Sequence, residues 1–307
     1  CSVNVFERGG RVGGAINTHS QNGWLAEFGP NTILETNTQI KTLITELGLD
    51  GEKLYPNSVS SNRFIVKNGK LLPLPISLLA FFSSSLFNAK SKFNIIREPF
   101  LAKWQNDYEE SLSEFVLRRL GQNFLDYAVN PFVAGVFAGD PNKLSVKHAL
   151  SKLYKLEQDY GSLIKGQIKK AKLPAQSDDI PKNRAKMFSF KNGLKVLPET
   201  LASKLKTPIE FNAMVEQVQK LNEGWEITYN QQNEIKTLKA DNLIYAGTGH
   251  QLANCKIMNN KNLDLSFGNE IEYPPIAILT LGFHKNQIQH ALNGFGLLVP
   301  QVENLQI

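Results

Sequence analysis

Residues 1–14 constrain the fold more than any other part of the sequence. A short apolar run ends in an acid and leads directly into a glycine-rich turn; the residues concerned are Glu7, Arg8, Arg11, Gly13 and Gly14. This order is typical of the second strand of a dinucleotide-binding fold, where a carboxylate binds ribose hydroxyls and glycines let the backbone approach a pyrophosphate. In such folds the phosphate-binding Gly-x-Gly-x-x-Gly lies about 20 residues before the acid, whereas only six residues precede Glu7. We therefore expect the sequence to begin inside its cofactor domain.

Taken alone, this strand and turn would also fit an ordinary β-hairpin. A second segment, residues 23–31, changes the balance because Glu27 stands two positions before the pair Gly29-Pro30. Such a pair forms a turn that cannot be helical, since proline has a fixed φ angle and no backbone N–H. The two turns together favour a nucleotide site.

Residues 7–15 and 27–31 together resemble the flavin-dependent amine oxidase superfamily. Later segments narrow the resemblance to the oxygen-dependent protoporphyrinogen oxidases, in order and in approximate spacing, from end to end of the chain. These segments are residues 62–75, 97–100, 135–141, 161–166, 188–194 and 293–300. The family's first strand with its phosphate loop, and its part after Pro300, have no counterpart in this sequence. We therefore expect a fragment of a longer enzyme.

The resemblance implies FAD as the cofactor. The positions that match the family's cofactor residues are Glu7, Arg8, Arg11, Gly13, Gly14, Gly29, Pro30, Val215, Ala246 and Gly247. In the family, the first five meet the ribose and the pyrophosphate, and the Gly-Pro pair runs beside the isoalloxazine. The strand around Val215 hydrogen-bonds the adenine, and the turn with Ala246 lies near the flavin. Either of these last two segments could equally be an ordinary sheet element.

The resemblance also implies oxidation of protoporphyrinogen IX to protoporphyrin IX with dioxygen as acceptor, a step of haem and porphyrin biosynthesis. Because FAD accepts the hydride, the protein mainly binds and orients the tetrapyrrole and excludes water, and we expect no dedicated catalytic residue. The matching substrate contacts are Arg63, Gly135, Ile276 and Phe295.

Each substrate contact has a plainer alternative. Arg63 would pair with a propionate, because a guanidinium fits a carboxylate in two hydrogen bonds, or it would be a solvated arginine at a strand end. Ile276 and Phe295 would sandwich the tetrapyrrole rings, or would pack in a core. Gly135 would bring backbone close to the reacting ring, or would serve only a tight turn.

Other functions stay open: a coproporphyrinogen III oxidase that forms coproporphyrin III, another flavin amine oxidase or desaturase, and a flavin-free porphyrin-binding protein. The number of substrate propionates depends on how many cations line the far end of the cavity. No metal site is expected, because none of the five histidines has a metal-ligand spacing to a cysteine or carboxylate.

The net charge of +6 is concentrated in residues 152–186, with nine Lys/Arg and four Asp/Glu. This stretch could attract an anionic lipid surface or a carboxylated substrate, although a solvated loop fits equally well. Residues 76–96 combine apolar side chains with Lys90 and Lys92, which suits a helix lying on a membrane or a buried helix. Nucleic acid is not an expected partner, and a homodimer is compatible with the sequence.

The two cysteines, Cys1 and Cys255, provide no disulfide framework and fit a reducing compartment. No signal peptide is recognised, and no apolar run reaches the ~18 residues that span a bilayer. We therefore expect a cytoplasmic protein, and the resemblance together with residues 76–96 implies that it is peripherally associated with the inner membrane.

The apolar pattern predicts the helices and strands, and together with the resemblance it implies an α/β plus α+β protein. An incomplete Rossmann-like FAD-binding domain would comprise residues 1–62 and 186–255. A mixed-sheet substrate domain would comprise residues 63–185, with a helical membrane-associated insertion, and the truncated segment 256–307. Helices are predicted at residues 38–47, 76–96, 112–120, 124–129, 146–156 and 197–205. Strands are predicted at residues 63–66, 71–74, 186–190, 209–218, 225–229, 243–246, 276–283 and 295–299, with a hairpin turn at Asn68-Gly69.

Overall fold

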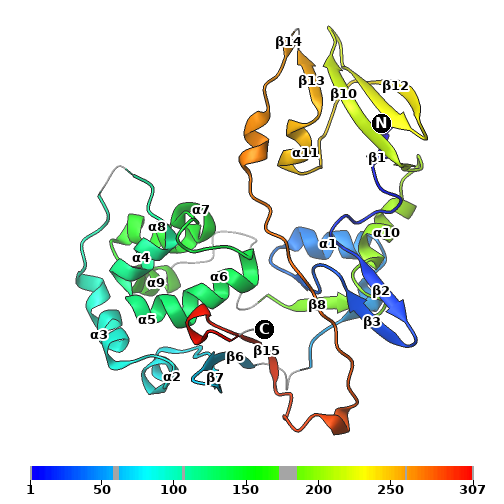
Figure 1. Ribbon diagram of the computed structural model, residues 1–307. Coiled ribbons are helices and arrows are strands. Elements are labelled where there is room, and N and C mark those ends of the chain that lie inside the picture. The colour runs from blue at the N-terminus through cyan, green and yellow to red at the C-terminus, as the bar shows by residue number, and fades with distance from the viewer. Residues whose placement is uncertain (1, 58–61, 106–107, 173–184, 260, 306–307) are drawn as a thin grey trace. The chain divides into compact units, whose positions relative to one another are not determined.

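The computed structural model describes residues 2–57, 62–105, 108–172, 185–259 and 261–305 (Figure 1). The chain forms two compact units. Unit 1 comprises Cys1–Tyr55, Asp179–Tyr273 and Ala277–Gly282, and unit 2 comprises Pro56–Asp178, Pro274–Ile276 and Phe283–Ile307. Each unit is therefore built from segments that lie far apart in the sequence.

The largest sheet of unit 1 has the strand order β12-β11-β10-β13-β14. Its strands are β10 (Ala213–Lys220), β11 (Trp225–Gln231), β12 (Glu234–Ala240), β13 (Lys256–Asn259) and β14 (Lys261–Asn262). The first three form an antiparallel meander, whereas β13 runs parallel to β10. The connection to β13 includes α11 (Gly249–Ala253).

Short strand pairs complete unit 1 and join distant parts of its sequence. They are β1 (Phe6–Glu7) with β9 (Glu210–Phe211), β2 (Thr18–Gln21) with β3 (Trp24–Glu27), and β8 (Met187–Phe190) with both β4 (Ile33–Leu34) and β5 (Lys53–Leu54). The predicted helix at residues 38–47 is confirmed as α1 (Thr38–Glu46), with Asn37 accepting the Ile40 N–H at 2.9 Å. Residues from α1, the turn after it, β8 and the segment before α10 (Val196–Ser203) form the core: Ile44, Leu47, Leu49, Phe188, Phe190 and Leu194.

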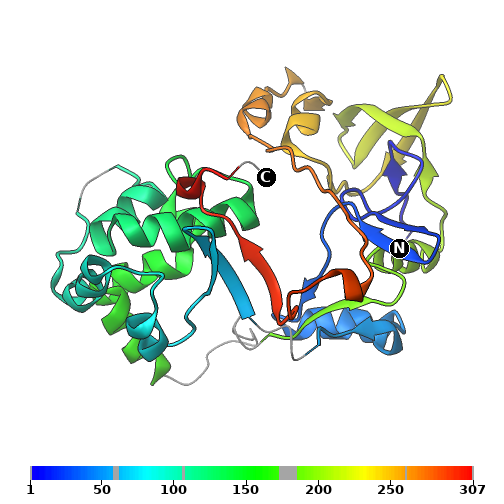
Figure 2. The same cartoon turned by 60° about the horizontal axis from the view of Figure 1, so that its bottom comes forward.

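Unit 2 combines a three-stranded sheet with short helices. The predicted hairpin is confirmed as β6 (Asn62–Lys67) and β7 (Lys70–Pro73), and β15 (Gly294–Leu298) lies parallel to β6 (Figure 2). The helical elements are α2 (Leu78–Ser83), α3 (Ala89–Arg97), α4 (Leu112–Arg119), α5 (Gln122–Phe124), a π-helical turn (Leu125–Val129), α6 (Asn130–Phe137), α7 (Val146–Ala149), α8 (Ser151–Tyr160) and α9 (Leu163–Ala171). None of the helices in the described ranges combines the length and apolar character needed to cross a bilayer.

The prediction of a single helix at residues 76–96 is wrong. Ser84 takes an extended backbone conformation after α2, and Asn88 caps α3 by accepting the Ser91 N–H at 2.9 Å. The break between the two helices turns Leu86 and Phe87 into the core of unit 2. Local capping by a short polar side chain therefore outweighs the continuous helical pattern.

Two predicted strands, residues 243–246 and 276–283, are also wrong. Both segments lie within the described ranges and are not paired into a sheet, and Ile244 and Leu279 are 90% and 83% exposed. An apolar run shows that a segment can form a strand, but a strand also needs a neighbour for its backbone groups. Residues 256–273, assigned from the sequence to the substrate domain, lie in unit 1, where β13 pairs with β10.

Candidate functional site

Glu7 closes β1 and stabilises the turn that follows. Pairing with β9 places Glu7 opposite Phe211, and the turn returns to that strand through a hydrogen bond from Asn212 N–H to the Gly9 carbonyl at 3.1 Å. The half-buried Glu7 carboxylate accepts the Gly9 N–H at 2.6 Å through Oε1. A carboxylate has about four acceptor positions, so Glu7 retains the capacity to accept hydroxyl groups.

Gly13 and Gly14 form the bend of the same loop, and both have left-handed φ angles, 98° and 54°. A Cβ at Gly13 would lie 2.6 Å from the Ile16 carbonyl oxygen, whereas nothing lies within 4 Å of a Cβ at Gly14. Gly13 is thus required by the fold of the loop. The exposed Gly14 offers bare backbone to a ligand.

The two predicted arginines occupy different environments. Arg11 donates to the backbone carbonyls of Val12, Gly14 and Ile16 at 3.1, 2.7 and 3.1 Å, so its guanidinium holds its own loop together. Arg8 is exposed, and its charge opposes the rise in the pKa of Tyr245 that burial causes. Arg8 is therefore the better-placed cation for a pyrophosphate.

Residues 27–31, the second predicted segment, pack directly against the glycine-rich loop that follows β1. Phe28 N–H donates to the Asn17 carbonyl at 2.8 Å. A Cβ at Gly29 would collide with the Ala15 carbonyl oxygen. The structure therefore brings Gly29 and Pro30 together with the Glu7 loop, and only glycine permits this close approach.

Glu27 and Thr18 position this segment, a role that the sequence did not reveal. Glu27 accepts the Thr18 hydroxyl at 2.7 Å and the Leu194 N–H at 2.7 Å, and Thr18 Oγ1 accepts the Lys195 N–H at 3.1 Å. The junction joins the β2–β3 hairpin to the loop before α10. The sequence shows the acid near Gly29 and the Asn192-Gly193 pair, but no pattern in it indicates that these two segments are in contact.

The remaining cofactor positions also lie in unit 1. Val215 is half-buried in β10, opposite Tyr229 and next to an irregularity at residue 216. The ring centroids of Tyr229 and Phe6 lie 4.6 Å apart, which places β11 beside β1. Ala246 and Gly247 are exposed in a turn that the Tyr245 hydroxyl stabilises by donating to the Thr248 carbonyl at 2.8 Å.

These residues fit a dinucleotide such as FAD. They supply a carboxylate for ribose hydroxyls, an exposed cation for phosphate, and two stretches of backbone where side chains are excluded. Their assignment to individual groups of FAD stays a prediction.

In unit 2, Arg63 and Phe295 lie on the neighbouring strands β6 and β15. Parallel pairing sets Gly294 opposite Asn62 and Gly296 opposite Arg63, so Phe295 is the extra residue of a β-bulge. Asn62 Nδ2 reinforces the bulge by donating to the Asn293 carbonyl at 3.1 Å. Both Arg63 and Phe295 are exposed. Bulges redirect side chains and are common beside active sites.

Gly135 lies on α6 and faces the same strand. A Cβ there would come within 2.9 Å of Leu298 Cδ2, so the glycine lets α6 approach β15. Ile276, in contrast, is 73% exposed in an irregular stretch. In the part of the chain that the structure describes, no hydrogen bond or ring contact joins Ile276 to the Arg63–Phe295 pair.

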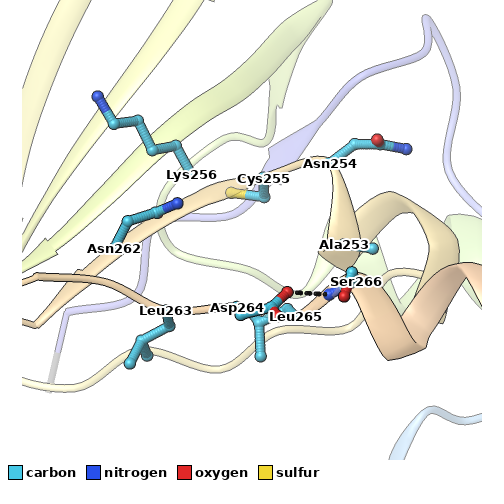
Figure 3. A pocket seen from close by; sticks show the side chains of 9 residues that line it. All are labelled: Ala253, Asn254, Cys255, Lys256, Asn262, Leu263, Asp264, Leu265 and Ser266. Atoms are coloured by element: carbon cyan, nitrogen blue, oxygen red, sulfur yellow. Dashed lines mark hydrogen bonds between the residues drawn. The ribbon is translucent and has the colours of Figure 1, made fainter.

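Two pockets have no predicted site residue in their lining. One, of about 360 Å³, is in unit 1 between Asn254 and Ser266, where Asp264 accepts the Ser266 N–H at 3.0 Å (Figure 3). Burial raises the pKa of its Cys255 thiol, which disfavours a reactive thiolate. The other, of about 620 Å³, is in unit 2 beside Ser111 and Ser145. Among the described residues, no group of three or more His, Cys, Asp or Glu could hold a metal ion.

Comparison with known proteins gives consistent matches. The model of the flavin-containing amine oxidoreductases matches residues 1–304. Protoporphyrinogen oxidase 2 (chloroplastic/mitochondrial) of Arabidopsis thaliana is 33% identical over 98% of this chain, which spans 64% of that protein. Coproporphyrinogen III oxidase of Bacillus subtilis (strain 168) is 25% identical over 99% of this chain and 65% of its own length. The crystal structure of a protein from Exiguobacterium sp. 255-15 superposes with a TM-score of 0.63 at 20% identity, covering 82% of this chain and 55% of that one, which shows a shared fold.

Proposed function

The chain belongs to the flavin-containing amine oxidoreductases, a family of FAD-dependent oxidoreductases, and on this basis we propose that the protein carrying it oxidises a porphyrinogen with dioxygen as acceptor. The proposed substrate is protoporphyrinogen IX and the product protoporphyrin IX, a step in haem biosynthesis. The observation that carries the proposal is the pairing of β6 with β15, which places the exposed Arg63 and the exposed Phe295 on neighbouring strands. A tetrapyrrole with propionate groups needs both.

The residues of this chain would bind and orient the substrate. Arg63 would hold a propionate in two hydrogen bonds, and Phe295 would lie against the flat macrocycle. When bound, FAD supplies the acceptor for a hydride from the substrate. Glu7, Arg8 and the Gly13-Gly14 bend would hold the ribose and pyrophosphate, and Gly29 and Pro30 would run beside the isoalloxazine.

Coproporphyrinogen III is the alternative substrate, favoured by the similarity to the Bacillus enzyme. The test is anaerobic mixing of the purified protein with each porphyrinogen while flavin absorbance is followed. Rapid bleaching by protoporphyrinogen and slow bleaching by coproporphyrinogen support the proposal; the reverse order supports the alternative. Bleaching by neither would refute porphyrinogen oxidation, and a colourless protein that still binds porphyrin would indicate a flavin-free carrier.

We further propose that the helical part of unit 2 lies on an anionic membrane on the cytoplasmic side. Ile76, Leu79 and Phe100 are 97%, 84% and 84% exposed. Lys165 of the basic helix α9 lies 5.7 Å from the centroid of the Phe100 ring, so apolar and cationic groups meet there. Co-sedimentation with vesicles tests this. Binding to vesicles with anionic lipid and not to neutral ones is expected, and no binding to either would contradict it.

A further inference from the structure

Three side chains of unit 2, Lys67, Tyr127 and Glu303, connect β6, the π-helical turn and the segment after β15. The Tyr127 hydroxyl donates to Glu303 Oε1 at 2.9 Å, and Glu303 Oε2 accepts the Asn68 N–H at 2.7 Å. Lys67 Nζ lies 4.7 Å from the centroid of the Tyr127 ring and donates to the Leu86 carbonyl at 2.6 Å. We refer to these three residues as the Tyr127 clamp.

The clamp touches both strands that carry the proposed substrate contacts. Tyr127 packs in the apolar cluster that includes Ile65 of β6 and Leu298 of β15, and these two residues are register partners. Leu298 also meets Gly135 of α6, the helix that follows the π-helical turn directly. A displacement of Tyr127 would therefore move β6, β15 and α6 relative to one another. Single π-helical turns inside helices are frequent at functional sites.

The Tyr127–Glu303 hydrogen bond is of the strong, charge-assisted type, because a phenol donates to a carboxylate. Burial, together with this bond, raises the pKa of Tyr127 to about 12, so the phenol keeps its proton. A second contact reinforces the same connection, since Gln301 N–H donates to Asn130 Oδ1 at 3.2 Å. The segment after β15 is thus held at two points, Tyr127 of the π-helical turn and Asn130, the first residue of α6.

We propose that the Tyr127 clamp is a positioning device for the substrate: it fixes β15 on β6 and α6 so that Arg63 and Phe295 meet the macrocycle together. This inference rests on the proposed porphyrinogen oxidation and adds to it. Lys67, Tyr127 and Glu303 act through the strands and do not touch the reacting atoms.

The test uses the purified flavoprotein and three variants. Glu303→Ala removes both acceptors of the clamp. Glu303→Gln is the conservative variant, because its amide oxygen can accept the Asn68 N–H while its amide nitrogen donates to the phenol oxygen. Lys70→Ala is the matched control, because Lys70 is an exposed residue of the β6–β7 hairpin that carries Lys67. We expect Glu303→Ala to raise the KM for porphyrinogen about tenfold with little change in kcat, and Glu303→Gln and Lys70→Ala to stay near the wild-type value.

Hydrogen exchange provides a readout that does not depend on turnover. In Glu303→Ala, the amides of residues 294–298 should exchange faster than in Glu303→Gln. Unchanged exchange there would overturn the proposal, whatever the activity. Faster exchange with an unchanged KM would leave only a structural role and would also overturn it. A wild-type protein that oxidises no porphyrinogen would refute the proposed function instead, and the exchange result would then still decide whether the clamp holds β15.

Discussion

Arg119 shows how single residues determine the helical part of unit 2. Its side chain is fully buried, and it donates to Glu98 Oε1 at 3.1 Å, to the Gly161 carbonyl at 3.0 Å and to Glu157. Glu98 in turn accepts the Ser162 hydroxyl at 2.6 Å and the Leu163 N–H at 2.8 Å, which caps α9. A buried charge is tolerated only when it is fully paired, so these contacts allow few alternative arrangements of the helices.

Glu157 links this network to the pH dependence of stability. Burial alone would raise the pKa of its carboxyl, but hydrogen bonds from Arg118, Arg119 and the Trp104 N–H outweigh burial and lower the pKa below its usual range. Because the folded-state pKa lies below the unfolded one, the ionised carboxylate stabilises the fold at neutral pH. That contribution is lost as the pH falls below about 4.

We expect Glu157→Gln to reduce the free energy of unfolding by about 3 kcal/mol at pH 7, because two buried or half-buried arginines lose a charged partner. The reduction should shrink as the pH falls below about 4. Urea unfolding at a series of pH values measures both effects. Asp159→Asn is the control, since Asp159 is exposed on the same helix, α8. Equal losses in the two variants, or a loss at Glu157 that is independent of pH, would contradict the assignment.

At the level of elements, the junction of the β2–β3 hairpin with the loop before α10 depends on Gly193. Its φ angle is 83°, and a Cβ would lie 2.6 Å from Thr18 Oγ1 and 2.8 Å from Glu27 Oε1. We expect Gly193→Ala to reduce the free energy of unfolding by about 2–4 kcal/mol, from backbone strain and overpacking together, and to lower the FAD content.

Gly23→Ala separates the two causes. Gly23 has a similar φ angle of 79°, but nothing lies within 4 Å of a Cβ there, so this variant carries the backbone strain alone. Thermal unfolding and the ratio of flavin to protein absorbance measure the difference. Equal changes in melting temperature and in flavin content for both variants would show that the contacts with Thr18 and Glu27 are unimportant.

Elements specified by neighbouring residues could be predicted from the sequence. The hairpin at Asn68-Gly69 is an example, because its turn chemistry is local. The segment 243–246 could not be assigned correctly, because pairing depends on a distant neighbour that apolar content does not reveal. The same limit applies to the site: Glu27 and Leu194 are 167 positions apart, and the hydrogen bond between them has no sequence signature. Arg63 and Phe295 were connected only through the family resemblance.

For the whole molecule, the division into units separates the two sets of proposed ligand contacts. Glu7, Arg8, Gly29 and the other cofactor positions all belong to unit 1, whereas Arg63, Gly135, Ile276 and Phe295 all belong to unit 2. Residues that share no partner usually have additive effects on free energy. Flavin retention and substrate affinity should therefore respond to different substitutions.

We expect Glu7→Gln to weaken FAD binding about tenfold, because an ionised acceptor is lost, while the KM for porphyrinogen at saturating FAD is unchanged.

Arg63→Ala should raise the KM for porphyrinogen about tenfold with full flavin content. The KM of Arg63→Lys should lie between those of the wild type and Arg63→Ala, because an ammonium keeps the charge but not the bidentate geometry. The double variant should show both changes in full. Loss of flavin in Arg63→Ala would show that the two sets are coupled, and an unchanged KM would refute the assignment of Arg63 to a propionate.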